Sequence, residues 1–211
     1  MFHTGRKAAL TLALALGAPA AWALDPSFDC SKAASEAEQA VCASDALASL
    51  DLELARLYRL AESAPGQTKA GRDSLHAMQR GWIKGRDECW KSSLGVPLCT
   101  ANEYAFRIYD LRRDHAEARA EEGASLGPFE YACDGMEAPL SAVFVNTQEP
   151  AIVLRWGDNA IVLPRVPSGS GAKYEGAMWA DGPSLFWEQG GEARFAPPGG
   201  EEAVCKLADI G

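Results

Sequence analysis

Histidine is scarce in this 211-residue sequence, which contains only His3, His76 and His115. The sequence also lacks the HExxH, P-loop and GxGxxG patterns of zinc, nucleotide and dinucleotide sites. Ser168 and Ser170 have neither a local histidine base nor a strand-to-helix nucleophile elbow, so they are poor nucleophiles. We therefore expect no enzyme activity, no metal and no cofactor. A hydrolase built from scattered carboxylates is the alternative, although no spacing singles out a pair.

Basic residues are also in deficit, with 20 Lys and Arg against 29 Asp and Glu and a net charge of −9. A protein that binds nucleic acid needs a basic face for the phosphates, so we expect no nucleic-acid partner. The acidity has two interpretations. It keeps the protein soluble, or it steers the protein toward a basic partner.

Long apolar runs are absent after the first residues of the chain. Arg6 and Lys7 precede the apolar stretch 8–16, and the segment 21–23 has small residues where a signal peptidase reads them. This pattern predicts a signal peptide over 1–23, cleaved after Ala23. Because the apolar stretch is short and no second one follows, we expect an exported, periplasmic protein without a stable membrane anchor.

The six cysteines include no CxxC pair, which makes a redox or zinc motif the weaker alternative to disulfides. An even number in an exported chain predicts three disulfides, for which fifteen pairings exist. Spacing favours Cys30 with Cys42, Cys89 with Cys99, and Cys133 with Cys205. The three residues before Cys30 are Ser, Phe and Asp, which differ from the small apolar sequence of a lipid-anchored protein.

Apolar residues recur at helical spacing in the first half of the chain. The pattern predicts helices over 33–42, over 44–64 with Ser44 or Asp45 as N-cap, and over 73–89. Thr100 and Glu103 form a capping-box pattern, which predicts the start of a fourth helix. The first half is thus predicted to be a helical bundle stapled by two disulfides.

The pattern changes to short β-rich runs after a predicted linker at 123–128. Gly157-Asp158-Asn159 and Gly190-Gly191 are predicted hairpin turns. The predicted strands are 129–133, 140–146, 151–156, 160–166, 173–179, 185–189, 193–196 and 203–207. We therefore expect an α+β two-domain protein, with a helical domain over 24–122 and a small antiparallel β-barrel or sandwich over 129–211.

The segment Ser168-Gly169-Ser170-Gly171-Ala172-Lys173-Tyr174 is rich in glycine and serine. One interpretation is a flexible turn between two strands. The other is a protruding loop, in which a bare backbone approaches another molecule and small hydroxyls donate hydrogen bonds.

Residues 129–205 resemble the MliC/PliC family of bacterial inhibitors of c-type lysozyme. The matching pieces are Tyr131-Ala132-Cys133-Asp134, the 168–174 loop, the segment 186–193 and Cys205. The resemblance implies an eight-stranded barrel whose loop enters the lysozyme cleft, where Ser170 hydrogen-bonds a catalytic carboxylate. The lysozyme-binding residues that it predicts are Ser168, Ser170, Gly171, Lys173, Tyr174 and Gln189.

Gln189 departs from this family, which usually has lysine before the corresponding glycine. Glutamine donates hydrogen bonds but forms no ion pair, and Glu188 beside it would repel cleft carboxylates. We hypothesise that Lys173 compensates for the missing lysine.

Residues 27–113 resemble a second family, the LprI-like N-terminal domain of exported bacterial proteins. The matching features are Phe28-Asp29-Cys30, Glu38, Cys42, Leu50-Asp51, Tyr58, Gln79, Trp82, Arg86, Cys89, Cys99, Tyr104 and Arg107. Trp82 is predicted to anchor the helical core. Gln79, Arg86 and Arg107 are predicted to join the helices by hydrogen bonds rather than to bind a ligand.

Together these features predict an exported inhibitor of c-type lysozyme that acts by loop insertion. The alternative is an envelope adaptor whose barrel has lost inhibition and whose bundle binds another partner. The helical domain has no assigned task beyond the hypothesis that it adds a second contact surface. The sequence leaves the oligomeric state and the orientation of the two domains open.

Overall fold

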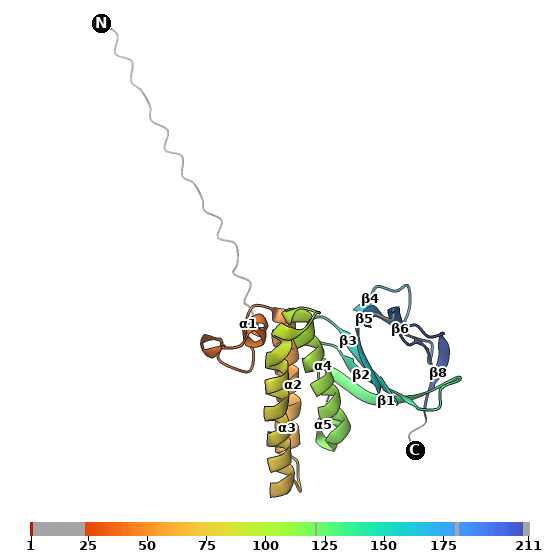
Figure 1. Cartoon of the computed structure of the whole chain (residues 1–211), viewed down its shortest axis with the longest axis horizontal. Helices are drawn as coiled ribbons and strands as arrows, with labels where there is room; N and C mark the ends of the chain where they lie inside the picture. The colour runs from red at the N-terminus through yellow and green to blue at the C-terminus, as the bar shows by residue number, and fades with distance from the viewer. Residues whose placement is uncertain (2–23, 121, 180–181, 209–211) are drawn as a thin grey trace.

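The computed structural model describes residues 1, 24–120, 122–179 and 182–208 (Figure 1). The predicted signal peptide and its cleavage after Ala23 lie outside the described residues. Within the described ranges, no helix is long and apolar enough to cross a membrane. A group of helices occupies one end of the molecule and a barrel occupies the other, which confirms the predicted fold class.

The helical region contains short 3-10 turns and longer α-helices. The α-helices are α1 (Glu36–Cys42), α2 (Asp45–Glu62), α3 (Lys69–Asp87), α4 (Val96–Asp114) and α5 (Ala116–Ala120), and the 3-10 turns are η1 (Cys30–Lys32) and η2 (Glu88–Lys91). At the N-termini of α1, α2 and α3, the N-cap side chain accepts a hydrogen bond from a backbone N–H of the first turn. Ser44 Oγ accepts from Leu47 N, and Ser35 and Glu38 form a capping box at α1.

The fourth helix begins earlier than the sequence predicted. Thr100 lies inside α4, fully buried, and Gly95 is the N-cap, with a φ of 77°. Pro97 fits the first turn because the N–H that it lacks has no partner within the helix. The Cys89–Cys99 disulfide ties this turn to η2. The predicted capping box at Thr100 and Glu103 is therefore wrong.

Disulfides join all three predicted pairs: Cys30–Cys42, Cys89–Cys99 and Cys133–Cys205. The first two close short loops in the helical region. Cys133 and Cys205 lie directly opposite each other on β1 and β8, where the barrel closes.

A buried polar network joins three of the helices. The Tyr104 hydroxyl donates to Asp51 Oδ1 over 2.9 Å and accepts from Arg86 Nη1 over 3.0 Å. The Trp82 ring packs edge-on against Tyr104, with centroids 5.1 Å apart. Arg107 Nε donates to Gln79 Oε1 over 3.0 Å, linking α4 to α3. The structural roles predicted for these side chains are confirmed.

The second half forms a closed antiparallel barrel in which each strand pairs with the next, and β8 with β1. Its strands are β1 (Ser125–Cys133), β2 (Leu140–Val145), β3 (Ala151–Trp156), β4 (Asn159–Val166), β5 (Ala172–Trp179), β6 (Gly182–Gln189), β7 (Glu192–Ala196) and β8 (Ala203–Leu207). Turns at 157–158 and 190–191 join β3 to β4 and β6 to β7, as predicted.

Strand β1 starts inside the segment that the sequence analysis treated as a linker. Ser125 is buried, and its hydroxyl donates to Glu53 Oε1 on α2 over 2.5 Å. Arg112 Nε on α4 donates to the carbonyl oxygen of Gly127 over 2.7 Å. Residues 125–128 are therefore part of the barrel and are fixed to two helices by buried hydrogen bonds.

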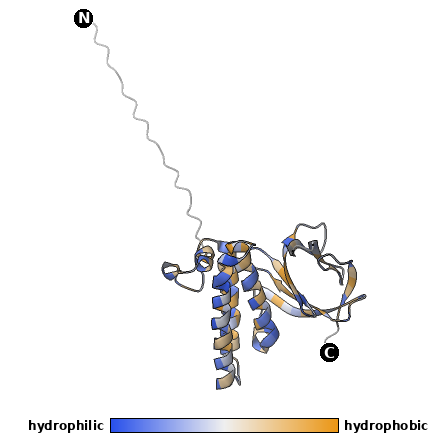
Figure 2. Ribbon diagram, viewed as in Figure 1, coloured by the Kyte–Doolittle hydropathy of each residue, from blue (hydrophilic) through white to orange (hydrophobic). Residues whose placement is uncertain are grey.

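One side of the barrel is covered by helices. All six residues of β2 are buried. Leu140, Ala142 and Phe144 face the barrel interior, whereas Val143 and Val145 on the opposite face pack into the helical core. Val153 on β3 and Val162 on β4 extend this outer apolar stripe, part of the hydrophobic colouring of Figure 2. Continuous apolar runs are typical of strands that are buried on both faces.

Candidate functional site

The loop between β4 and β5, residues 167–171, is exposed along its whole length, and Ser168, Gly169 and Ser170 lie at its centre. Ser168 Oγ donates to the carbonyl oxygen of Gly171 over 3.1 Å, which closes the loop on itself. Gly171 has a φ of 68°, and a Cβ there would collide with the carbonyl oxygen of Glu188 on β6. Only glycine fits this position, so the close approach of two backbones defines the loop conformation.

Strand β6 holds the loop through two side chains that reach the same residue. The indole Nε1 of Trp187 donates to the Ser170 carbonyl oxygen over 3.0 Å, and Gln189 Nε2 donates to Ser170 Oγ over 2.5 Å. A serine hydroxyl has two lone pairs and one proton. Gln189 occupies one lone pair, and no described residue accepts the Ser170 proton. The exposed hydroxyl is therefore held in place with its proton available to an external acceptor.

Lys173 lies at the base of the loop, opposite Trp187 across the β5–β6 ladder. Its Nζ is 2.5 Å from Glu175 Oε2 on the same outward face. Lys173 therefore brings a cation close to the Ser170 loop, although it shares its charge with a neighbouring carboxylate.

Tyr174 is separated from the other predicted contact residues because its side chain points into the barrel. It is only 1% exposed and packs against the rings of Phe144 and Phe186. Burial raises the pKa of its phenol, with a smaller contribution from Glu188 in the same direction and an opposing one from Arg165. Tyr174 thus supports the strand beneath the loop and offers no ring surface to a partner.

Glu188 does not lie on the outward face with Gln189, where the sequence predicted that it would repel cleft carboxylates. In the strand register it pairs with Ala172 and Ala193, which belong to the inner layer of the barrel. Its carboxylate acts on interior phenols, since burial and then Glu188 raise the pKa of Tyr131. Glu188 therefore alternates away from the outward face on which Gln189 contacts the loop.

Trp187 is the residue of this site to which the sequence analysis gave no role. The signal was present, because alternation with the buried Phe186 places the indole on the outer face, beside a glycine-rich loop. An indole whose N–H is satisfied by a loop carbonyl fixes that loop without blocking its tip.

Comparison with known proteins matches each half of the chain to a different family model. The model of the family described as membrane-bound lysozyme-inhibitor of c-type lysozyme (MliC) matches residues 131–203, and that of lysozyme inhibitor LprI matches residues 30–122. Both resemblances inferred from the sequence are thereby confirmed.

Two relatives match most of the chain. The proteins named lipoprotein LprI from Mycobacterium bovis and Mycobacterium tuberculosis are 34% identical to it over 174 residues, which are 80% of this chain and 78% of theirs. A crystal structure of Pseudomonas aeruginosa MliC in complex with hen egg white lysozyme is 26% identical, with a TM-score of 0.31, over 40% of this chain and 80% of that one. The chain belongs to the LprI family, and its C-terminal half is an MliC-type barrel.

Proposed function

We propose that this protein inhibits c-type lysozyme by inserting the β4–β5 loop into the catalytic cleft of the enzyme. The observation that carries the proposal is the exposed Ser170 hydroxyl, which Gln189 holds while leaving its proton free. The family relationship supports the choice of target. The protein acts by binding alone and requires no chemistry of its own.

The geometry suits the chemistry of the target. Lysozymes of this type use two carboxyl groups that flank the glycosidic bond, and a carboxylate is a hydrogen-bond acceptor. A donor hydroxyl on a narrow loop can satisfy such an acceptor and exclude the sugar chain from the same space. Because Ser170 is already fixed by Trp187 and Gln189, little further ordering is needed on binding.

The proposed contact set contains Ser168, Ser170, Gly171, Lys173 and Gln189, with Tyr174 beneath them as support. Gln189 stands where related inhibitors usually have lysine, and its role here is to position Ser170 rather than to supply charge. Lys173 is the cation nearest along the strand, and its ion pair with Glu175 must loosen before it can engage a carboxylate.

The remaining features fit an inhibitor in the cell envelope. We infer export to the periplasm after cleavage at Ala23, with a helical domain over 24–122 and a barrel domain whose first strand begins at Ser125. The net charge of −9 favours rapid association with a basic enzyme.

Lysis of a peptidoglycan suspension by a c-type lysozyme tests the proposal, with the oxidised protein added in increasing amounts. We expect dose-dependent inhibition, and an inhibition constant at least about tenfold weaker for Ser170→Ala, the loss of about 1.4 kcal/mol expected for a hydrogen bond to a charged group. Ser63→Ala, at the exposed end of α2, is the matched control. No inhibition by the wild type, or equal inhibition by Ser170→Ala, would contradict the proposal.

A further inference from the structure

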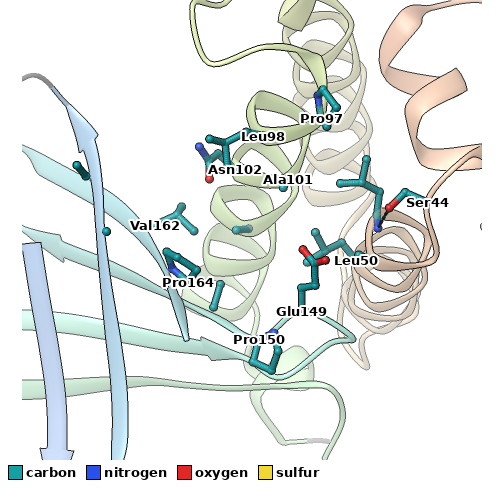
Figure 3. A pocket seen from close by; sticks show the side chains of 16 residues that line it. Ser44, Leu50, Pro97, Leu98, Ala101, Asn102, Glu149, Pro150, Val162 and Pro164 are labelled. Carbon is teal, nitrogen blue, oxygen red and sulfur yellow. Dashed lines mark hydrogen bonds between the residues drawn. The ribbon is translucent and has the colours of Figure 1, made fainter. Parts of the chain in front are cut away.

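A cavity lies between the helical region and the barrel, on the side that α4 covers (Figure 3). The cavity has a volume of about 630 Å³ and is lined by residues of α2 and α4, the start of β3, and strands β4 and β5. Leu50, Ala101, Val162 and Pro164 contribute apolar surface to it. This volume is typical of small-molecule sites, which occur preferentially between domains.

Asn102 on α4 is the first sign that the cavity accommodates a ligand. The residue is 7% exposed, its side chain extends toward the cavity, and its amide forms no hydrogen bond with any described residue. The amide is not enclosed by protein atoms at the cavity. It can therefore exchange hydrogen bonds with water or with a polar group of a ligand inside the cavity.

Glu149, just before β3, is the second sign. It is the one charged residue among the described residues of the lining, it is exposed at the cavity, and no ion pair holds it within the described chain. An unpaired carboxylate at the rim of the cavity attracts a cation and repels an anion, and the effect is screened by salt because the group is exposed. A fatty acid or another anionic amphiphile is therefore disfavoured.

We propose that this cavity binds a small apolar amine. The apolar body lies against Leu50, Val162 and their neighbours, the ammonium group pairs with Glu149, and a carbonyl or hydroxyl group satisfies the Asn102 amide. An apolar dipeptide with a free amino terminus has all three parts. The site is separate from the Ser170 loop and does not depend on the function proposed for it.

Such a ligand would contact both halves of the molecule at once. Ala101 and Asn102 belong to α4, whereas Val162 and Pro164 belong to β4. A molecule that binds only the docked arrangement stabilises it, by a free energy that grows with the logarithm of the ratio of its concentration to its dissociation constant. Occupancy is therefore expected to raise the unfolding midpoint of the whole protein.

Calorimetric titration of the oxidised protein with phenylalanyl-leucinamide tests the proposal. N-acetyl-phenylalanyl-leucinamide, which has the same side chains but no charge, is the matched ligand control. We expect saturable binding of the free amine, at least tenfold weaker binding of the acetylated form, and a higher unfolding midpoint with the amine alone. Absence of binding at millimolar concentration, or equal affinity for both dipeptides, would overturn the proposal.

Variants locate the binding within the molecule. Glu149→Gln should weaken binding about tenfold by removing the ion pair, whereas Glu201→Gln, an exposed carboxylate before β8, should leave it unchanged. Asn102→Leu should also weaken binding of the amide-bearing probe. Equal affinity of Glu149→Gln and the wild type would overturn the site, whatever the result for Asn102→Leu.

Discussion

The two sides of the barrel are built from the same kind of strand but serve different purposes. On the β2–β4 side, outward valines such as Val143 and Val153 are buried under helices. On the β5–β6 side, the outward positions carry Lys173, Trp187 and Gln189, and the last two hold an exposed loop by hydrogen bonds to Ser170. A single closed sheet thus has one side that packs against helices and another that carries the loop to which we assign lysozyme binding.

The comparison shows how a small barrel can present a rigid loop. The covered side is joined to the helices by apolar packing and by buried polar contacts, including Arg155 Nη2 at 3.1 Å from Asp110 Oδ1. Because these contacts stabilise the barrel on its covered side, the outward side chains of the uncovered side can serve binding. Changes on the first side should therefore alter folding, and changes on the second should alter inhibition.

The largest effect is expected from placing a charge on the covered side. Val153→Asp buries a carboxylate without a partner and should cost about 3–5 kcal/mol of unfolding free energy. Val204→Asp on β8, where the valine is 39% exposed, should change it by less than about 0.5 kcal/mol. Denaturant unfolding measures both, and similar losses for the two variants would remove the distinction between the sides.

A smaller loss of stability is expected from the hydrogen bond between β1 and α2. Ser125→Ala removes the donor to the buried Glu53 carboxylate and should cost about 1–3 kcal/mol. Ser184→Ala is the matched control, because the buried Ser184 hydroxyl has no partner among the described residues and its removal should be neutral or stabilising. An equal cost for both substitutions, measured in denaturant, would show that the β1–α2 bond contributes nothing specific.

On the recognition side, a glycine of the loop should differ from a glycine of the helical region. Gly171→Ala forces a Cβ against the Glu188 carbonyl oxygen and should weaken lysozyme inhibition at least about tenfold, or about 1.4 kcal/mol. A Cβ at Gly81 on α3 meets open space, so Gly81→Ala should leave inhibition unchanged. Inhibition assays with both variants check this, and equal inhibition would mean that loop geometry is unimportant.

The smallest effect concerns pH and two aspartates of α4. Burial raises the pKa of Asp110, against the pull of Arg155 and Arg113, whereas the hydrogen bond from Arg113 lowers the pKa of Asp114. The ordinary pKa of both carboxyl groups is 3.8. As pH rises above this value, ionisation of Asp110 lowers the stability of the protein. As pH rises toward this value, ionisation of Asp114 raises the stability.

We compare the unfolding free energy of each variant with that of the wild type. For Asp110→Asn this difference should favour the variant more at about pH 6 than at about pH 3, and for Asp114→Asn it should favour the variant less. Each change between the two pH values should be within about 1 kcal/mol. Unfolding free energies at both pH values measure it. The same sign for the two variants would contradict the assigned environments.

Much of this architecture could be predicted because its signals are local. Alternating strands and hairpin glycines predicted a small barrel or sandwich, the family resemblance implied the eight-stranded barrel, and cysteine spacing favoured all three disulfides. The misplaced start of α4 came from reading Thr100 as a cap, when Gly95 and the buried position of Thr100 determine the helix. A capping pattern inside a helix looks the same in sequence as one at its start.

Three features that depend on the folded barrel could not be predicted. Ser125 lies 72 residues from its acceptor Glu53, and the glycine-rich context made the segment resemble a linker. Tyr174 follows the loop so closely that it was assigned to the contact surface, although strand alternation turns it inward. The two hydrogen bonds that Ser170 receives from β6 depend on a register that only the folded barrel establishes.

Amide hydrogen exchange of the oxidised protein, with and without a c-type lysozyme, tests the difference between the two sides most directly. The complex should slow exchange in the β4–β5 loop, residues 167–171, and at the end of β6 beside Gln189. Exchange in α4 and in strands β2 and β3 should stay unchanged. Protection confined to the helices, with an unaffected Ser170 loop, would contradict the account and would place the lysozyme-binding surface elsewhere.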